Sequence, residues 1–195
     1  RLKESMVNFD GTPIFPKRTT KTIQYELTED EVTLYEAVTQ YVQTHFNRAM
    51  SFGHQSTAFA MMLLQRRLSS SIEAIHKSLG RRYKKLLAIL EDSELERKKY
   101  QQQVEQLYGR NLEEEVTESE ETLEKRLELA VDTIDIEVLK EEISELKRLL
   151  RMTKSLKEYG LEKKYLELEE MLFGVDGLIY TNEKILIFTE SVDTL

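Results

Sequence analysis

Apolar residues recur every three or four positions between residues 28 and 90, a spacing that predicts amphipathic helices. The first predicted helix starts at Thr28 and Glu31, which have the spacing of a capping box, and ends near Met50. Its apolar face consists of Val32, Tyr35, Val38, Val42 and Phe46. A second helix is expected from about Ser56 to the serine run that ends at Ser71.

The serine run at residues 69–71 predicts a joint, and Ser70 with Glu73 has the spacing to cap a third helix. That helix carries one apolar stripe, made of Ile72, Ile75, Leu79, Tyr83, Leu86 and Leu90. Gly80 lies inside it, where glycine costs about 1 kcal/mol relative to alanine. A kink or break is therefore expected at Gly80.

The second half of the chain has a different pattern. Residues 91–128 contain thirteen Asp or Glu against six Lys or Arg, with few apolar positions, which favours a helical hairpin packed along a narrow seam. From Ile136 a coiled-coil-like seam of about two heptads follows, on a helix that Gly160 ends. The seam positions are Leu139, Ile143, Leu146 and Leu150.

Two short segments have the pattern of strands. Residues 21–27 alternate apolar and polar side chains, and residues 184–190 form a short apolar run typical of a buried strand. The predicted strand at residues 184–190 either pairs with the one at residues 21–27 or pairs with strands beyond Leu195. We favour strands beyond Leu195, because one strand cannot build a sheet. The predicted fold class is mainly α: an elongated helical bundle or hairpin with a coiled-coil-like seam and two short strands near the ends.

Composition excludes several kinds of site. The chain has no cysteine, which removes disulfides, thiolate metal sites and cysteine nucleophiles and is consistent with a cytoplasmic protein. Its three histidines share no i, i+4 spacing, so no metal site is expected. No apolar run approaches the roughly 18–20 residues that span a bilayer, so no membrane contact is expected.

A local basic stretch stands out against the net charge of −8. The stretch between residues 58 and 90 has a single acid, Glu73, and its basic residues are Arg66, Arg67, Lys77, Arg81, Arg82, Lys84 and Lys85. Such residues contact nucleic-acid phosphates without reading bases. A solvated helix face paired with the following acidic segment explains the same pattern. Both interpretations stay open at this point.

Three stretches in order resemble the middle of a Swi/Snf-type, superfamily 2 helicase-like ATPase. The first resembles the exit from the first RecA-like lobe and comprises Arg1-Leu2-Lys3, Phe15-Pro16-Lys17-Arg18 and Leu27-Thr28-x-x-Glu31-x-x-Leu34-Tyr35. The second is similar to an inter-lobe helix of bacterial members related to the RNA-polymerase-recycling ATPase and reads Leu63-Leu64-Gln65-Arg66-Arg67-Leu68-Ser69-Ser70-Ser71. The third, residues 184–190 followed by Val192-Asp193-Thr194-Leu195, resembles motif IV, which opens the second lobe.

The resemblance implies four segments. Residues 1–27 would leave the first lobe, 28–90 would form inter-lobe helices, and 182–195 would hold the first strand of the second lobe. Residues 91–181 carry no family motif and would form an acidic helical insertion that projects as a partner-binding arm. The implied function is that of an internal fragment of an ATP-dependent DNA translocase.

The same resemblance sets expectations for ligands and site residues. The chain lacks the phosphate loop and the Walker B context, so ATP and Mg²⁺ are expected in the parent protein and no cofactor, metal or catalytic residue in this fragment. DNA is the expected partner through the parent motor. The candidate nucleic-acid-binding residues are Arg66, Arg67, Arg81, Arg82, Lys84, Lys85 and, by its place in motif IV, Thr189.

A different class of function fits part of the pattern. A stand-alone helical adaptor that associates through its leucine seams would account for the seam between Leu139 and Leu150 and for the acidic surface. An independent enzyme finds no support, because no paired catalytic groups converge in an apolar setting.

Overall fold

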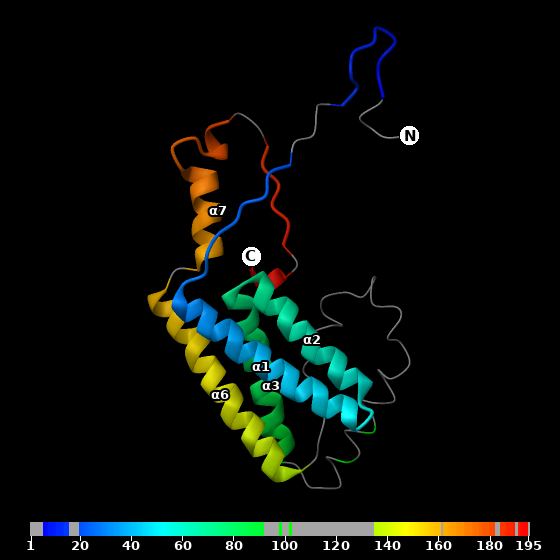
Figure 1. The fold of residues 1–195 in the computed structure, drawn as a ribbon, viewed down its shortest axis with the longest axis vertical. Helices are drawn as coiled ribbons and strands as arrows, with labels where there is room; N and C mark the ends of the chain where they lie inside the picture. The colour runs from blue at the N-terminus through cyan, green and yellow to red at the C-terminus, as the bar shows by residue number, and fades with distance from the viewer. Residues whose placement is uncertain are drawn as a thin grey trace.

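The chain folds around an antiparallel four-helix bundle in a computed structural model. The structure describes residues 6–15, 20–91, 98, 102, 135–160, 162–181, 184–189 and 191–194. The bundle consists of α1 (Glu29–Ser51), α2 (Gln55–Ser70), α3 (Ile72–Glu91) and α6 (Ile136–Tyr159). Each helix runs opposite to the one before it (Figure 1). The mainly helical fold class is confirmed.

One hydrophobic core joins all four bundle helices. Leu34 and Tyr41 of α1, Leu64 of α2, Leu79 of α3 and Leu146 of α6 are each fully buried in it. Burial of apolar side chains on this scale is the main force that holds helices together, because isolated helices of this length are marginal in water. We therefore expect the four helices to fold and unfold together as one cooperative unit.

The expected boundary between residues 90 and 91 does not separate two structural units. α6 lies in the expected insertion, yet it packs against α1 and α3 and contributes Leu139, Leu146 and Leu149 to the shared core. The expectation that residues 91–181 project as an arm is thus wrong for α6. Most of the acidic hairpin expected at residues 91–128 lies outside the described residues.

The buried face of α6 differs from the predicted seam. Its buried residues are Leu139, Glu142, Leu146, Leu149 and Thr153. Ile143 and Leu150 pack against the core from the side and are only half-buried. The helix is therefore rotated relative to the predicted stripe, and two polar residues face inward.

Several local predictions agree with the structure. Thr28 and Glu31 form the expected capping box of α1, and α6 ends at Tyr159 with Gly160 as its C-cap. The cap of α3 is Ser71, whose Oγ accepts from Ala74 N at 3.1 Å, rather than the predicted Ser70. α3 also runs unbroken through Gly80. A Cβ there would lie 3.9 Å from Leu150 Cδ2, so the glycine sits at the contact between α3 and α6.

A short helix and two extended segments lie beyond one end of the bundle. α7 (Lys163–Phe173) leads to the 3-10 turn η3 (Leu178–Tyr180), and the turn η4 (Val192–Thr194) returns to the bundle (Figure 1). The predicted strands at 21–27 and 184–190 are not confirmed. Among the described residues, pairing outside the helices is limited to one bridge, Val7 to Pro13.

Candidate nucleic-acid interface and its polar contacts

A buried ion pair lies at the centre of the bundle. Arg82 Nη2 lies 2.6 Å from Glu142 Oε1, and both side chains have no exposed surface. Tyr41 donates its hydroxyl to the same carboxylate oxygen at 2.7 Å, and Arg82 Nε donates to Tyr41 Oη at 2.8 Å. Burial raises the pKa of Tyr41 well above its ordinary value. The three groups join α1, α3 and α6.

The ion pair corrects one sequence-based prediction. Arg82 was expected at a nucleic-acid surface, but its guanidinium is enclosed in the bundle and neutralises Glu142. Moving it to a phosphate would leave a buried carboxylate without its partner, which costs several kcal/mol. Arg82 is therefore a structural residue of this fold.

His45 extends the buried group of polar residues. Its Nδ1 lies 3.5 Å from Glu142 Oε2 and its Nε2 lies 3.8 Å from Glu145 Oε2. The imidazole also stacks at a tilt on the ring of Tyr41, with centroids 4.5 Å apart. Within the described part of the chain, no group of three His, Asp or Glu side chains is arranged to hold a metal ion.

The joint between α2 and α3 holds residues 191–194. Arg67, which is 7% exposed, donates from Nη1 to the hydroxyl of Ser191. Thr194 Oγ1 lies 2.8 Å from Ser70 Oγ and 2.9 Å from Ser71 Oγ. The serine run that the sequence identified as a joint is thus also a docking point for the end of the described chain.

Asp193 pairs with two basic residues of α3, the candidate nucleic-acid-binding residue Arg81 and the nearby Lys77. Its Oδ2 accepts from Arg81 Nη2 at 2.8 Å, and its Oδ1 lies 3.3 Å from Lys77 Nζ. Burial by itself would raise the pKa of Asp193, but the hydrogen bonds and charges of Arg81 and Lys77 outweigh it and hold that pKa below its ordinary value. The carboxylate is therefore ionised and bound.

The remaining candidate residues lie apart from the buried ion pair. Arg66 is exposed on α2, Lys84 is exposed on α3, and Lys85 is half-buried. Thr189 is exposed, and its hydroxyl lies 3.3 Å from both the N and the O of Ser191. Its hydroxyl thus holds the turn that leads into η4.

A second joint links α7 to the bundle. Glu31 Oε1 accepts from Lys163 N at 2.9 Å, and Glu162 Oε2 accepts from Ile72 N at 3.2 Å. Each carboxylate therefore satisfies a backbone donor at the start of another helix, where such donors lack helical partners. Burial raises the pKa of Glu162. Lys164 Nζ completes the joint by donating to Ser69 O and Ser70 O.

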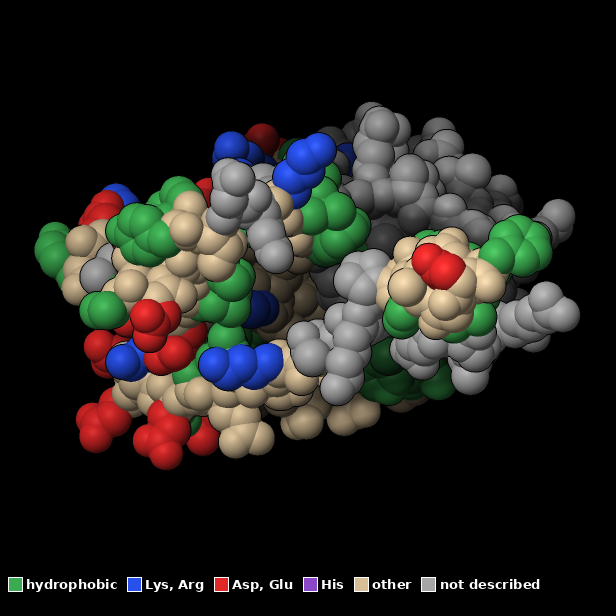
Figure 2. All heavy atoms as spheres, turned by 90° about the horizontal axis from the view of Figure 1, so that it is seen from above, with side chains coloured by type: hydrophobic (Ala, Val, Ile, Leu, Met, Phe, Trp, Pro, Cys, Tyr) green, Lys and Arg blue, Asp and Glu red, His purple; other side chains and the backbone are tan. Residues whose placement is uncertain are grey.

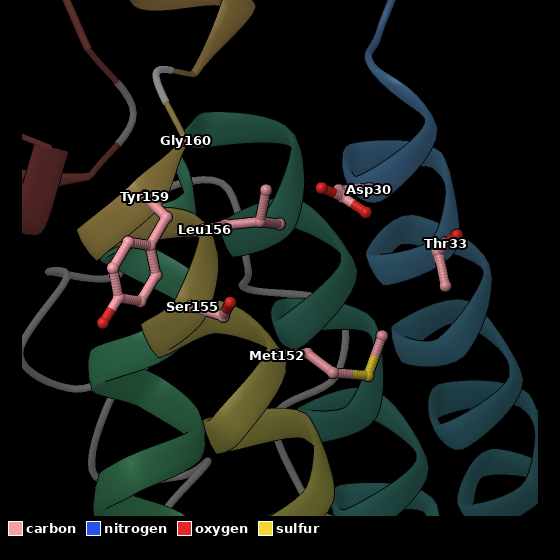
Figure 3. A pocket seen from close by; sticks show the side chains of 7 residues that line it. All are labelled: Asp30, Thr33, Met152, Ser155, Leu156, Tyr159 and Gly160. Carbon is pink, nitrogen blue, oxygen red and sulfur yellow. The ribbon is translucent and has the colours of Figure 1, made fainter.

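A shallow pocket of about 230 Å³ lies between the start of α1 and the end of α6. Asp30 and Thr33 face it from α1, and Figure 3 shows Met152 and Leu156 pointing toward α1 while Tyr159 points away. The described residues that line this pocket include no basic side chain, so it is a poor receptor for a phosphate group.

Exposed apolar side chains gather beyond the bundle end. They include Tyr165, Phe173, Val175, Ile179, Tyr180, Leu186 and Phe188. Figure 2 shows this end from above, with hydrophobic side chains at the surface among acidic and basic ones. Among the described residues no helix is both long and apolar enough to cross a membrane.

Comparisons with protein-family models, with curated proteins and with solved structures find no match for this chain.

Sequence reasoning missed two polar contacts of this region. Glu142 lies between leucines at a helical spacing and reads as a solvent-facing residue, so its burial has no signal in the local pattern. Asp193 is 112 positions from Arg81, and a pairing at that separation depends on the tertiary fold. The excess of cations around residues 66–85 indicates an acidic partner but does not identify it as Asp193.

Proposed function

We propose that this chain is the region between the two RecA-like lobes of a Swi/Snf-type, ATP-dependent DNA translocase, with the helical bundle as a rigid bridge. The observation that carries the proposal is the exposed apolar segment at residues 185–188. Ile185, Leu186, Ile187 and Phe188 are 42%, 76%, 52% and 85% exposed.

Four successive apolar side chains in water are unfavourable in a folded protein. Each would gain about 1.5–3 kcal/mol from full burial. An extended apolar segment of this length is typical of a strand buried within a parallel sheet, where both faces are covered. Residues 184–189 would therefore form the first strand of the second lobe, and residues 21–27 would form the last extended segment of the first.

The bundle geometry supports a bridging role. The chain enters α1 at Thr28 and leaves the docked segment at Thr194, and both points lie at the same end of the bundle (Figure 1). A close-packed bundle transmits displacement, whereas a flexible linker absorbs it. Movement of one lobe would thus be passed to the other through the bundle.

The surface of the bundle supplies DNA contacts in this proposal. Arg66, Lys84 and Lys85 would bind backbone phosphates, which adds affinity without sequence preference. Thr189 would contact a phosphate only after its turn with Ser191 opens. ATP and Mg²⁺ would bind in the lobes, because the phosphate loop they require is not part of this sequence.

DNA-stimulated ATPase activity of the full-length protein tests the proposal. Reversing Arg66 and Lys84 to glutamate should raise the DNA concentration for half-maximal stimulation by about tenfold, because two phosphate contacts are lost. The matched control reverses Lys147 and Arg151, which are exposed on α6, and should change little. The isolated chain should hydrolyse no ATP. Equal effects from the two pairs, or ATP turnover by the isolated chain, would contradict the proposal.

A helical adaptor is the second candidate function. The exposed apolar side chains of α7 and η3, among them Tyr165, Phe173 and Ile179, favour a protein partner at that surface. The coiled-coil-like seam and the acidic surface would serve association in this alternative, whereas the partner-binding acidic arm belongs to the translocase proposal. Sedimentation of the isolated chain separates the two: concentration-dependent dimerisation lost in Phe173→Ser would favour the adaptor.

A further inference from the structure

Polar contacts hold residues 191–194 on the bundle. The hydrophobic core and the apolar side chains packed on it end at Leu156 in the described sequence. Val192, the apolar residue of η4, is 69% exposed. Ion pairs near a surface are weak and are screened by salt. A segment held in this way can be displaced by a competing anion.

The groups that hold the segment have the chemistry of a phosphate site. Arg81 and Lys77 bind the two oxygens of one carboxylate, and the hydroxyls of Ser70 and Ser71 lie beside them around Thr194. Arginine, lysine and hydroxyl groups are the usual ligands of a phosphodiester. The Asp193 carboxylate stands where a phosphate oxygen pair would bind.

The charges around this position favour an anion. Arg67, Lys77 and Arg81 come from α2 and α3, and Asp193 is the acid supplied by the docked segment. Glu73 also faces Lys77, at 3.6 Å, but it is shared with Lys157 of α6. Replacing one carboxylate by a phosphodiester keeps the charge balance.

We propose that Lys77, Arg81, Ser70 and Ser71 form a binding site for a phosphate of the DNA backbone, and that Asp193 occupies it when residues 191–194 are docked. Docking and DNA binding at this site then exclude each other. The identity of the ligand as DNA rests on the proposed function. In a two-lobe motor, DNA would release the segment that directly follows the first strand of the second lobe.

Duplex DNA binding by the chain, measured against salt concentration, tests the site. Asp193→Asn should tighten binding of a 20-base-pair duplex by about fivefold and steepen the salt dependence by about one unit, because one or two cations are released. Adding Lys77→Gln and Arg81→Gln should remove this gain. The matched control is Asp176→Asn, the same change at an exposed aspartate in the turn after α7.

A separate readout follows the segment itself. The chain has no cysteine and no tryptophan, so a bimane label on Val192→Cys and a quenching tryptophan at Ser69→Trp report docking directly. Duplex DNA should relieve the quenching, and inorganic phosphate at the same ionic strength should do so only at far higher concentration.

Three results of these experiments would contradict the proposed phosphate site. If Asp193→Asn and Asp176→Asn strengthen binding equally, the effect is one of net charge and the site is refuted. If Asp193→Asn relieves quenching while DNA affinity stays unchanged, the segment moves but Lys77 and Arg81 bind no phosphate. If no variant binds duplex DNA at low salt, the DNA-contact part of the proposed function fails together with the site.

Discussion

Arg82 and Glu142 lie sixty positions apart in sequence and form an ion pair at 2.6 Å with no exposed surface on either side chain. The pair fixes the register of α6 against α3, because a shift of α6 by one residue would move Glu142 away from the guanidinium. Tyr41 completes the arrangement by hydrogen bonding to both partners. The chain thus carries a buried charged contact next to the hydrophobic core that joins the four helices.

Removing one partner of this pair should destabilise the bundle strongly. Glu142→Gln or Arg82→Met should each lower the free energy of unfolding by about 3–5 kcal/mol, because the other charge stays buried and uncompensated. The double variant Arg82→Met/Glu142→Leu should recover most of the loss. Chemical denaturation followed by circular dichroism measures all three. Single variants that lose less than about 1 kcal/mol would show that the charges reach water.

Gly80→Ala should stabilise the chain. The position is helical, and the new Cβ would meet Leu150 Cδ2 at 3.9 Å, an ordinary contact. Alanine should therefore add up to about 1 kcal/mol through helix propensity. Gly80→Leu is the contrasting variant, since its larger side chain has to displace Leu150. If thermal unfolding shows Gly80→Ala to be less stable than the unmodified chain, the contact between α3 and α6 at Gly80 has no room for a methyl group.

The capping box of α1 should be measurable in the same way. Thr28→Ala removes the Oγ that accepts from Glu31 N at 3.2 Å and should cost about 1 kcal/mol. Thr33→Ala serves as the control, because Thr33 is exposed one turn later and only bonds the carbonyl of Glu29. Equal losses in the two variants would mean that the cap contributes nothing beyond helix propensity.

Tyr35 should ionise late in an alkaline titration. Burial, followed by the charges near it, raises its pKa to about 12 from 10.0, while its hydroxyl donates to Leu68 O at 3.0 Å. A raised pKa means that the folded state holds the proton more tightly. The stability contributed by protonated Tyr35 is complete below about pH 10 and is lost as the pH rises through about 12.

Ultraviolet difference titration detects this group. Tyr35→Phe should remove one phenol from the part of the absorbance curve near pH 12. Loss of a phenol near pH 10 instead would show that the hydroxyl of Tyr35 is open to solvent.

Local signals in the sequence predicted the helix ends and most of the apolar stripe of α3, but not the inward face of α6. Thr28, Glu31 and Gly160 act through neighbours within four residues, so their roles follow from spacing alone. Glu142 acts through Arg82 and Tyr41, which come from other helices. The predicted seam has Ile143 and Leu150 at positions where the structure buries Glu142 and Leu149. Helix propensity is a local property, so it does not predict which polar residue forms a buried contact with another helix.

The residue types of the candidate site could likewise be predicted from the sequence, whereas their burial and partners could not. The excess of cations on α2 and α3 is visible in the sequence, as is the joint at Ser69–Ser71. Which cations stay at the surface is decided by the rotation of α3, which turns Arg82 into the core and leaves Lys84 outside. The partner of Arg81 is Asp193, and that contact depends on the return of the chain to the bundle.

Hydrogen–deuterium exchange at residues 185–188 tests the bridging account most directly. In the isolated chain these amides should exchange within seconds, because the segment is extended and exposed. In the full-length protein the same amides should be protected by a factor of at least about a thousand, as strands in the interior of a sheet are. Rapid exchange in both proteins would contradict the account, because the segment would then belong to no sheet.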